Sequence, residues 1–279
     1  MTPSSTLIQT SLPNHPKMAE RPPYVPGPGD PLTEAGVARA NIAPDREHPL
    51  GTTEEGWAER HKEQSVMQQH CEYFDPDHDG VIWPRDTYNG CRNFGWGIPL
   101  SLFATFIIHL NLSYPTVPGK IPDPFFRIWY ANAYRLKHGS DSMTYDFEGR
   151  YRPQFFEEIF TRYDRDNKGG LTFRDVLRMW AGQRMAFDFY GWCATFLEWL
   201  GVYLLLWPED GVMRKDDIRR VYDGSIFYKK AEDFKKKRKV ETELSRAGQK
   251  PSMPLWRRAL ALVLVLFTSI WAVRRYMQG

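Results

Sequence analysis

The sequence contains the stretch Asp75-Pro76-Asp77-His78-Asp79-Gly80-Val81-Ile82-Trp83-Pro84-Arg85-Asp86. Acidic residues stand at its positions 1, 3, 5 and 12, a glycine at position 6 and an apolar residue at position 8. Ca²⁺ takes six to eight oxygen ligands, and the helix–loop–helix calcium motif supplies them at this spacing, including a backbone carbonyl at position 7. The stretch therefore predicts a calcium site between two helices, made by Asp75, Asp77, Asp79, Val81 and Asp86.

The last ligand of this loop departs from the usual pattern. Position 12 normally carries a glutamate that binds with both oxygens, whereas Asp86 is one methylene shorter. Either the loop tightens or the ion is held more weakly, and a weaker site tolerates Mg²⁺. A solvated acidic turn is the alternative interpretation, but Gly80 and Ile82 both fall in register with the calcium motif.

The segment ahead of the loop predicts a helix that carries a histidine. Met67, His70, Cys71 and Phe74 recur at intervals of three and four residues, so they share one helical face. His70 on that face is either a hydrogen-bonded core residue or a ligand. Its spacing alone does not distinguish the two.

The composition excludes several classes of protein. The chain has 279 residues and a net charge of only +3, without the broad basic footprint that nucleic-acid binding requires. Its three cysteines, Cys71, Cys91 and Cys193, are widely spaced. We therefore expect no disulfide framework, no zinc motif and a reducing compartment.

Two segments on either side of the loop have distinct compositions. Residues 1–50 are rich in proline and poor in aliphatic residues, so we expect a disordered segment. Residues 98–112 form an apolar run that is shorter than the roughly 20 residues needed to cross a bilayer, and prolines follow it. This run is either a buried core helix or a segment that enters one leaflet and turns back. A further helix is expected from Phe125 to His138.

Two later segments read as degenerate calcium loops. Residues 164–175 keep the period of the motif, but Lys168 stands at position 5, where an ammonium group argues against metal binding. Around Asp210 only the centre of a loop remains, with Leu206 and Pro208 at positions 1 and 3. We expect these segments to serve as structural pairing partners, which leaves one metal site.

Other motifs extend the pattern beyond calcium. They are His138-Gly139-Ser140-Asp141, Phe155-Phe156-Glu157-Glu158-Ile159-Phe160, Phe187-Asp188-Phe189-Tyr190-Gly191-Trp192, Glu198-Trp199 and Arg219-Arg220-Val221-Tyr222-Asp223-Gly224-Ser225. Together with the calcium loop, they resemble the caleosin family, the Ca²⁺-binding haem peroxygenases of lipid droplets and related membranes. The resemblance covers roughly residues 60 to 230.

The resemblance implies a fold and a cofactor. The fold is mainly α, with EF-hand-like helix–loop–helix pairs, an inserted hydrophobic segment and a C-terminal hydrophobic helix, and the caleosin-like domain spans residues 51–230. Two histidines of the family are associated with haem, and the matching positions here are His70 and His138. A neutral imidazole is a common ligand of haem iron, and a second one can ligate or act as an acid and base. Both residues are therefore implied to bind haem b and to take part in catalysis.

Other polar residues are weaker candidates for a role in the reaction. His78 lies at a non-ligand position of the calcium loop and His109 lies in the apolar run, so neither is expected to touch haem. Tyr145 and Arg150 are candidates for orienting a peroxide or a carboxylate. Arg150 is equally well explained as a structural ion-pair partner.

The resemblance also implies substrates and a location. The oxygen donor is a lipid hydroperoxide and the acceptor an unsaturated fatty acid, in a calcium-dependent reaction at the cytosolic face of a lipid droplet or of the endoplasmic reticulum membrane. A homo-oligomer is left open. The alternative is a non-catalytic, calcium-responsive structural protein of lipid droplets or membranes. Binding of haem separates the two.

The C-terminal part of the chain lies beyond the resemblance. Residues 231–254 form a basic linker, and residues 255–275 are a predicted membrane anchor. As a helix, the uncharged run 259–273 spans roughly 22 Å, short of a hydrocarbon core of about 30 Å. Flanking arginines and interfacial tryptophans extend this reach. A hydrophobic helix that docks on the folded domain is the alternative.

Overall fold

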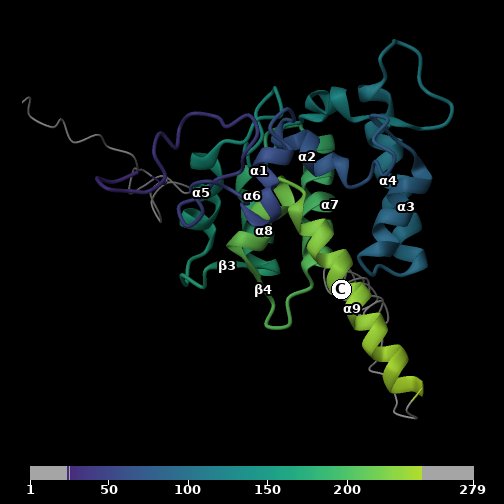
Figure 1. The fold of residues 1–279 in the computed structure, drawn as a ribbon. Coiled ribbons are helices and arrows are strands. Elements are labelled where there is room, and N and C mark those ends of the chain that lie inside the picture. The colour runs from purple at the N-terminus through teal and green to yellow at the C-terminus, as the bar shows by residue number, and fades with distance from the viewer. Residues whose placement is uncertain (1–23, 25, 247–279) are drawn as a thin grey trace, which may run out of the picture. The chain divides into compact units, whose positions relative to one another are not determined.

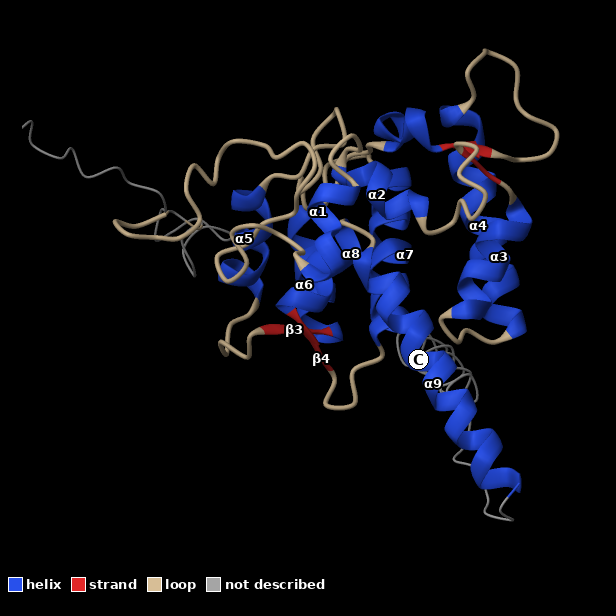
Figure 2. Ribbon diagram, in the orientation of Figure 1, coloured by secondary structure: helices blue, strands red, loops and turns tan. Residues whose placement is uncertain are grey.

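The computed structural model describes residue 24 and residues 26–246. Most of these residues lie in helices, which confirms a mainly α fold, as Figure 1 and Figure 2 show. The longer helices are α2 (Val66–Glu72), α3 (Pro84–Asn93), α4 (Ile98–Thr116), α5 (Pro153–Tyr163), α6 (Phe173–Gln183), α7 (Phe189–Leu206), α8 (Lys215–Tyr222) and α9 (Ser225–Arg246). The shorter elements are η1 (Glu54–Gly56), α1 (Trp57–Arg60), β1 (Val81–Ile82), β2 (Ile128–Trp129), η2 (Tyr130–Leu136), β3 (Gly170–Thr172) and β4 (Val212–Arg214).

The contacts within the chain divide it into two compact units. Unit 1 contains the described residues up to Glu72 and the segment Trp129–Ile226. Unit 2 contains Tyr73–Ile128 and the described residues from Phe227 onward. The chain leaves unit 1 directly after α2, so the two predicted haem histidines belong to unit 1 and the calcium loop belongs to unit 2.

Unit 1 contains two helix–loop–helix segments joined by a short sheet. β3 lies between α5 and α6, β4 lies between α7 and α8, and the two strands pair antiparallel with Leu171 opposite Met213. Both of these side chains are buried in the core. α6 begins with a capping box in which the side chains of Thr172 and Asp175 each accept a hydrogen bond from the other's backbone N–H.

The N-terminal segment differs from the expectation of disorder over residues 1–50. From residue 26 onward the chain belongs to unit 1, and Leu32 is fully buried. The backbones of Arg39 and Tyr151 exchange two hydrogen bonds, and the buried Arg219 of α8 donates to the Ala43 carbonyl at 3.1 Å. The periodicity of apolar residues could not indicate this order. The described part of the segment has no regular secondary structure, and hydrogen bonds to residues distant in the sequence hold it in place. Residues 1–23 lie outside the described part.

In unit 2, α4 presents apolar side chains outward. Its buried residues are all polar: Ser101, Thr105, His109, Ser113 and Thr116. Its exposed large side chains are all apolar or aromatic: Ile98, Leu102, Phe103, Phe106, Leu110 and Tyr114. A surface helix of a water-soluble protein shows the opposite polarity. α4 is therefore not the buried core helix that one interpretation of residues 98–112 expected.

Two of the described helices, α4 and α7, are long and apolar enough to cross a membrane by length and composition. α4 has 19 residues and continues past Pro115, so the chain does not turn back at the first proline after the apolar run. α7 has 18 residues and buries a stripe that includes Thr195 and Trp199. α7 is thus also a core helix of unit 1.

The helix expected from Phe125 to His138 does not form. The Asp123 side chain accepts hydrogen bonds from the backbone N–H and the guanidinium of Arg127, at 2.8 and 2.9 Å, and Phe126 adopts a left-handed φ of 55°. A local side-chain contact of this kind competes with helical hydrogen bonding. The chain continues instead as β2 and the 3₁₀ helix η2.

The described basic residues of the predicted linker lie on α9. Residues 235–239 are part of this helix, which continues to Arg246. The predicted membrane anchor, residues 255–275, lies outside the described residues.

Candidate functional site

His70 lies in the last turn of α2 and contacts α8. Its Nδ1 lies 2.7 Å from the carbonyl oxygen of Val221. Because a carbonyl can only accept, Nδ1 carries the proton, and in the neutral ring the lone pair is on Nε2. Burial lowers the pKa of His70 and outweighs that hydrogen bond and the charge of Glu198, both of which raise it. His70 is therefore a neutral imidazole at neutral pH.

A glycine allows the close approach of α2 to the turn after α8. Gly224 has a φ of +78°, and a Cβ at this position would lie 2.6 Å from the carbonyl oxygen of Gln69 and 2.8 Å from the Cα of His70. Any side chain at Gly224 would displace the backbone that carries His70.

His138 has a different electrostatic environment. Its Nδ1 lies 2.7 Å from the Gly139 carbonyl oxygen and its Nε2 lies 3.0 Å from Glu198 Oε1 on α7. Burial alone would lower the pKa of His138, but the hydrogen bond and charge of Glu198 outweigh burial and raise the pKa to about 9. Both ring nitrogens thus have acceptors, and His138 is an imidazolium at neutral pH.

One carboxylate connects the two histidines. Glu198 hydrogen-bonds to His138, and its charge also raises the pKa of His70. It acts in the same way on the hydroxyls of Tyr145 and Tyr222, whose pKa values burial already raises. Glu198 is therefore an acidic neighbour that raises the pKa of both His70 and His138 in unit 1.

The two other residues considered for orienting a substrate are engaged elsewhere. The Tyr145 hydroxyl donates to the Tyr222 carbonyl. Arg150 pairs with Asp146 at 2.6 Å and with Glu148 at 3.0 Å. Arg150 is thus the structural ion-pair partner that one interpretation of the sequence expected.

The two remaining histidines of interest lie in unit 2. His109 is buried in α4, where its Nε2 lies 2.8 Å from the Thr87 hydroxyl and its Nδ1 lies 2.6 Å from the Phe126 carbonyl oxygen. It is a hydrogen-bonded core histidine. His78 lies within the calcium loop with a left-handed φ of 57°.

The calcium loop brings three carboxylates together. One oxygen from each of Asp75, Asp77 and Asp79 lies within 4.8 Å of the others. Asp75 is buried and accepts from the backbone N–H of Gly80 at 2.9 Å, where a φ of +85° requires glycine. These hard oxygen donors fit Ca²⁺.

The two other predicted ligands of this loop have local roles. Asp86 is not part of the carboxylate group, because it accepts from the Trp83 N–H at 3.0 Å at the start of α3. The backbone N–H of Val81 donates to Asp79 at 2.8 Å. Asp86 must therefore reorient if it is to complete the coordination of an ion.

The degenerate loop 164–175 contains its own cation. Lys168 Nζ lies 3.0 Å from Asp164, 3.3 Å from Asp166 and 3.3 Å from Asp175. These three acids occupy positions 1, 3 and 12 of the motif, so the ammonium stands where the motif would hold an ion. This geometry gives the physical reason for the prediction that the loop does not bind metal.

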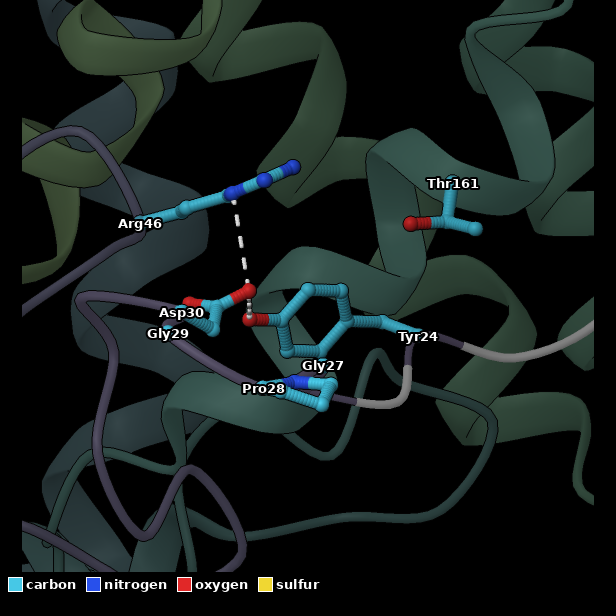
Figure 3. Close-up of a pocket in the computed structure, with 7 residues that line it drawn as sticks. All are labelled: Tyr24, Gly27, Pro28, Gly29, Asp30, Arg46 and Thr161. Carbon is cyan, nitrogen blue, oxygen red and sulfur yellow. Dashed lines mark hydrogen bonds and ion pairs between the residues drawn. The ribbon is translucent and has the colours of Figure 1, made fainter.

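A surface pocket occurs elsewhere in unit 1 (Figure 3). Its lining residues are Tyr24, Gly27, Pro28, Gly29, Asp30, Arg46 and Thr161. Within it, Asp30 accepts a hydrogen bond from the Tyr24 hydroxyl at 2.9 Å and pairs with Arg46 at 3.5 Å. No predicted site residue lines this pocket.

Glu198 is the residue of the site to which sequence reasoning gave no role. It appears in the sequence as an isolated acid in an apolar helix, Phe189–Leu206, and a charge within such a helix is the signal that could have drawn attention to it. Its partner His138 is 60 residues away.

The chain matches known proteins over most of its length. A family model described as caleosin related protein matches residues 62–231. A protein named peroxygenase from Lilium longiflorum is 39% identical over 209 residues, which cover 75% of this chain and 86% of that protein. A probable peroxygenase 4 from Arabidopsis thaliana is 36% identical over 60% of this chain and 86% of its own length.

A third relative has a different name. A probable inactive peroxygenase-like protein of Arabidopsis thaliana is 31% identical, over 59% of this chain and 76% of its own length. No solved structure matches the chain.

Proposed function

Since the chain belongs to the caleosin family and is a peroxygenase, we propose that it transfers oxygen from a fatty-acid hydroperoxide to an unsaturated lipid, with haem b held by His70. The observation that carries the proposal is the hydrogen bond between His70 Nδ1 and the Val221 carbonyl oxygen at 2.7 Å. Histidines that bind metals commonly donate their other N–H to a carbonyl or carboxylate, which orients the ring and raises its basicity. His70 fits this role. When bound, haem supplies the redox chemistry that cleaves the peroxide and passes on an oxygen atom.

His138 is assigned the proton transfer. Its Nε2 is protonated and pairs with Glu198 Oε1 at 3.0 Å. A proton transferred from this imidazolium would neutralise the alkoxide that leaves when a hydroperoxide is cleaved. After release of the proton, Glu198 favours its return to the ring. His138 is thereby kept as an acid, which suits it less well than His70 as an iron ligand.

The calcium loop is assigned a regulatory or structural ion. Asp75, Asp77 and Asp79 supply three carboxylates, and Asp86 and the Val81 carbonyl complete the predicted set. In unit 1, the segments α5–β3–α6 and α7–β4–α8 are proposed to be an EF-hand-like pair without an ion. The antiparallel register of β3 and β4 supports this assignment.

The outward apolar face of α4 supports the proposal that the protein binds a lipid surface. Side chains such as Phe103, Phe106 and Leu110 are more than half exposed, and the helix has no Asp, Glu, Lys or Arg. Contact with acyl chains would remove this area from water. We assign the cytosolic face of a lipid droplet or of the endoplasmic reticulum membrane as the location.

An absorption spectrum tests the cofactor and its ligand. We expect the wild-type chain, purified with haem available, to show a Soret band that His70→Ala abolishes. His138→Ala should keep the band and lower peroxygenase turnover by about 100-fold or more, the range for a lost general acid. His48→Ala, which changes a partly exposed histidine of unit 1, is the control and should alter neither.

The result that would sink the proposal is a colourless but well-folded wild-type chain. The chain would then be the calcium-responsive, non-catalytic protein of the alternative. A relative that is 31% identical is named a probable inactive peroxygenase-like protein. A Soret band lost in His138→Ala and kept in His70→Ala would reverse the roles of the two histidines.

A further inference from the structure

Residues 184–190 of unit 1, which connect α6 to α7 and include the first two residues of α7, expose several large apolar side chains. Met185 is 57% exposed, Phe187 87%, Phe189 63% and Tyr190 52%. Single exposed apolar residues are ordinary on a protein surface, but a group of large ones marks an interaction site. We call residues 184–190 the aromatic loop.

Hydrogen bonds fix the backbone of the aromatic loop. Asp188 accepts from the Gly191 N–H at 2.9 Å, which caps α7, and from the Ser140 hydroxyl at 2.6 Å. The same Ser140 hydroxyl lies 3.0 Å from the Met185 N–H, and the Trp192 indole donates to the Met185 carbonyl at 2.8 Å. The exposed side chains therefore project from an ordered backbone.

Close packing and strain add to this order. A Cβ at Gly139 would lie 2.5 Å from Asp188, and a Cβ at Gly191 would lie 2.1 Å from the same carboxylate. Phe187 adopts a left-handed φ of 60°, which costs a non-glycine residue on the order of 1 kcal/mol. Such strain persists where the surrounding structure imposes it, and here it holds the most exposed ring of the loop outward.

The aromatic loop is linked to the segment that carries the proposed catalytic histidine by a hydrogen bond and a ring contact. Ser140, which anchors the loop, is two residues after His138 and is buried. The ring of Tyr190 meets the ring of His138 edge to face, with centroids 6.0 Å apart. Whatever binds the loop is thus brought next to His138.

A positive charge stands at the base of the loop. Arg184 is exposed and its guanidinium lies 4.7 Å from the ring centroid of Trp180 and 5.5 Å from that of Trp192. Among the residues that the structure describes, no acidic side chain pairs with Arg184. A cation stacked on indoles beside exposed aromatic rings complements the boundary between phosphate headgroups and acyl chains.

We propose that the aromatic loop docks on an anionic phospholipid surface, with Phe187 and Phe189 among the acyl chains and Arg184 at the phosphates. A lipid surface requires only projecting apolar side chains with a cation beside them, and the loop supplies both. The docking itself stands without haem. Its use, the delivery of an acyl hydroperoxide to His138, rests on the proposed function.

A local probe tests the loop in the full chain, independently of α4 and of the C-terminal segment. An environment-sensitive dye is attached by maleimide chemistry to Phe187→Cys in a Cys193→Ser background. Burial raises the pKa of both Cys71 and Cys91 to about 12, so these thiols stay protonated and unreactive at neutral pH. Leu50→Cys, at a residue that is 69% exposed in unit 1, is the matched control.

Vesicles of phosphatidylcholine and phosphatidylserine should shift the emission of the dye at position 187 to the blue. Lipids that carry a nitroxide on the acyl chain should quench it, whereas the dye at position 50 should respond to neither. Arg184→Gln should raise the lipid concentration for half of the signal by about five-fold. Arg174→Gln, which removes the same charge from an exposed position of α6, should not.

Two results would overturn the proposal. The first is a dye at position 187 that stays in water, whether or not the chain sediments with the vesicles. The second is a blue shift that depends on protein concentration without lipid, which would assign the aromatic loop to a contact between copies of the chain. Neither readout requires haem or turnover, so a failure of docking is distinguishable from a failure of the proposed reaction.

Discussion

Glu198 sets the protonation of His138. Its Oε1 lies 3.0 Å from His138 Nε2, whereas Asp141 and Asp188 provide weaker acidic neighbours. In the haem-free protein, Glu198→Gln should lower the pKa of His138 from about 9 toward 6.5 or below, because burial is then opposed by fewer partners. A histidine NMR titration measures the change. Glu209→Gln, at an exposed glutamate of unit 1, should leave this pKa where it is.

The same substitution has a defined pH signature in stability. The pKa of His138 is raised on folding, so the contribution of Glu198 is fully present below about pH 6.5 and is lost as the pH rises through about 9. Urea unfolding should find Glu198→Gln less stable than wild type by up to about 1 kcal/mol at acidic pH, since Glu198 is exposed. The difference should vanish at alkaline pH. An equal difference at both extremes would contradict the assignment of the charge pair.

The sequence predicted some site residues and missed others for a physical reason. The spacing of Asp75, Asp77 and Asp79 is readable because the ligands of a calcium loop are local along the chain. His70 and His138 were assigned through family motifs, since nothing in their spacing joins them. Glu198 was not assigned, because its role depends on a contact across 60 residues that the fold alone creates.

At the scale of elements, the loop 164–175 holds a lysine where the calcium motif would hold an ion, and this exchange can be tested by mutation. Lys168 balances Asp164, Asp166 and Asp175 from within the loop. Lys168→Asp should cost about 3 kcal/mol without metal, because a partly buried charge network loses its cation. Calcium at roughly 100 times its Kd should restore about 2.7 kcal/mol. Thermal unfolding with and without calcium measures both effects.

A matched variant separates charge loss from ligand gain. Lys168→Met removes the cation without adding a fourth carboxylate, so we expect a smaller destabilisation than for Lys168→Asp and no rescue at this loop. Rescue of Lys168→Met to the same extent would mean that the three acids already bind calcium when the lysine is absent. In the wild-type loop, calcium would then be kept out because the Lys168 ammonium competes for the three acids, and not because a ligand is missing.

The element α4 illustrates what a pattern cannot decide. The recurrence of Ser101, Thr105, His109 and Ser113 every fourth residue is visible in the sequence, and it indicates a polar stripe. Whether that stripe faces water or the interior depends on its partners. In the structure His109 bonds to Thr87 of α3 and to the Phe126 carbonyl, so the stripe is inside and the apolar face is outside.

At the scale of the whole molecule, the contacts within the chain divide it into two units, and the predicted caleosin-like domain over residues 51–230 contains parts of both. Unit 1 combines segments on both sides of the calcium loop, and part of the predicted disordered segment belongs to it. Composition and periodicity describe neighbours along the chain. Neither property shows that the chain, which leaves unit 1 at Glu72, returns to it at Trp129.

This division gives a prediction for calcium removal, measured by hydrogen exchange. An ion bound only by the folded loop 75–86 stabilises that loop and α3, so chelation should speed exchange there by up to about 100-fold when calcium had stood at roughly 100 times its Kd. Peptides from β3 and β4 should not respond, because Lys168 serves their loop without metal. Asp75→Asn with Asp79→Asn should abolish the response to chelation. If β3 and β4 lost protection as strongly as α3, a second ion or a coupling through the whole chain would have to replace the single-site assignment.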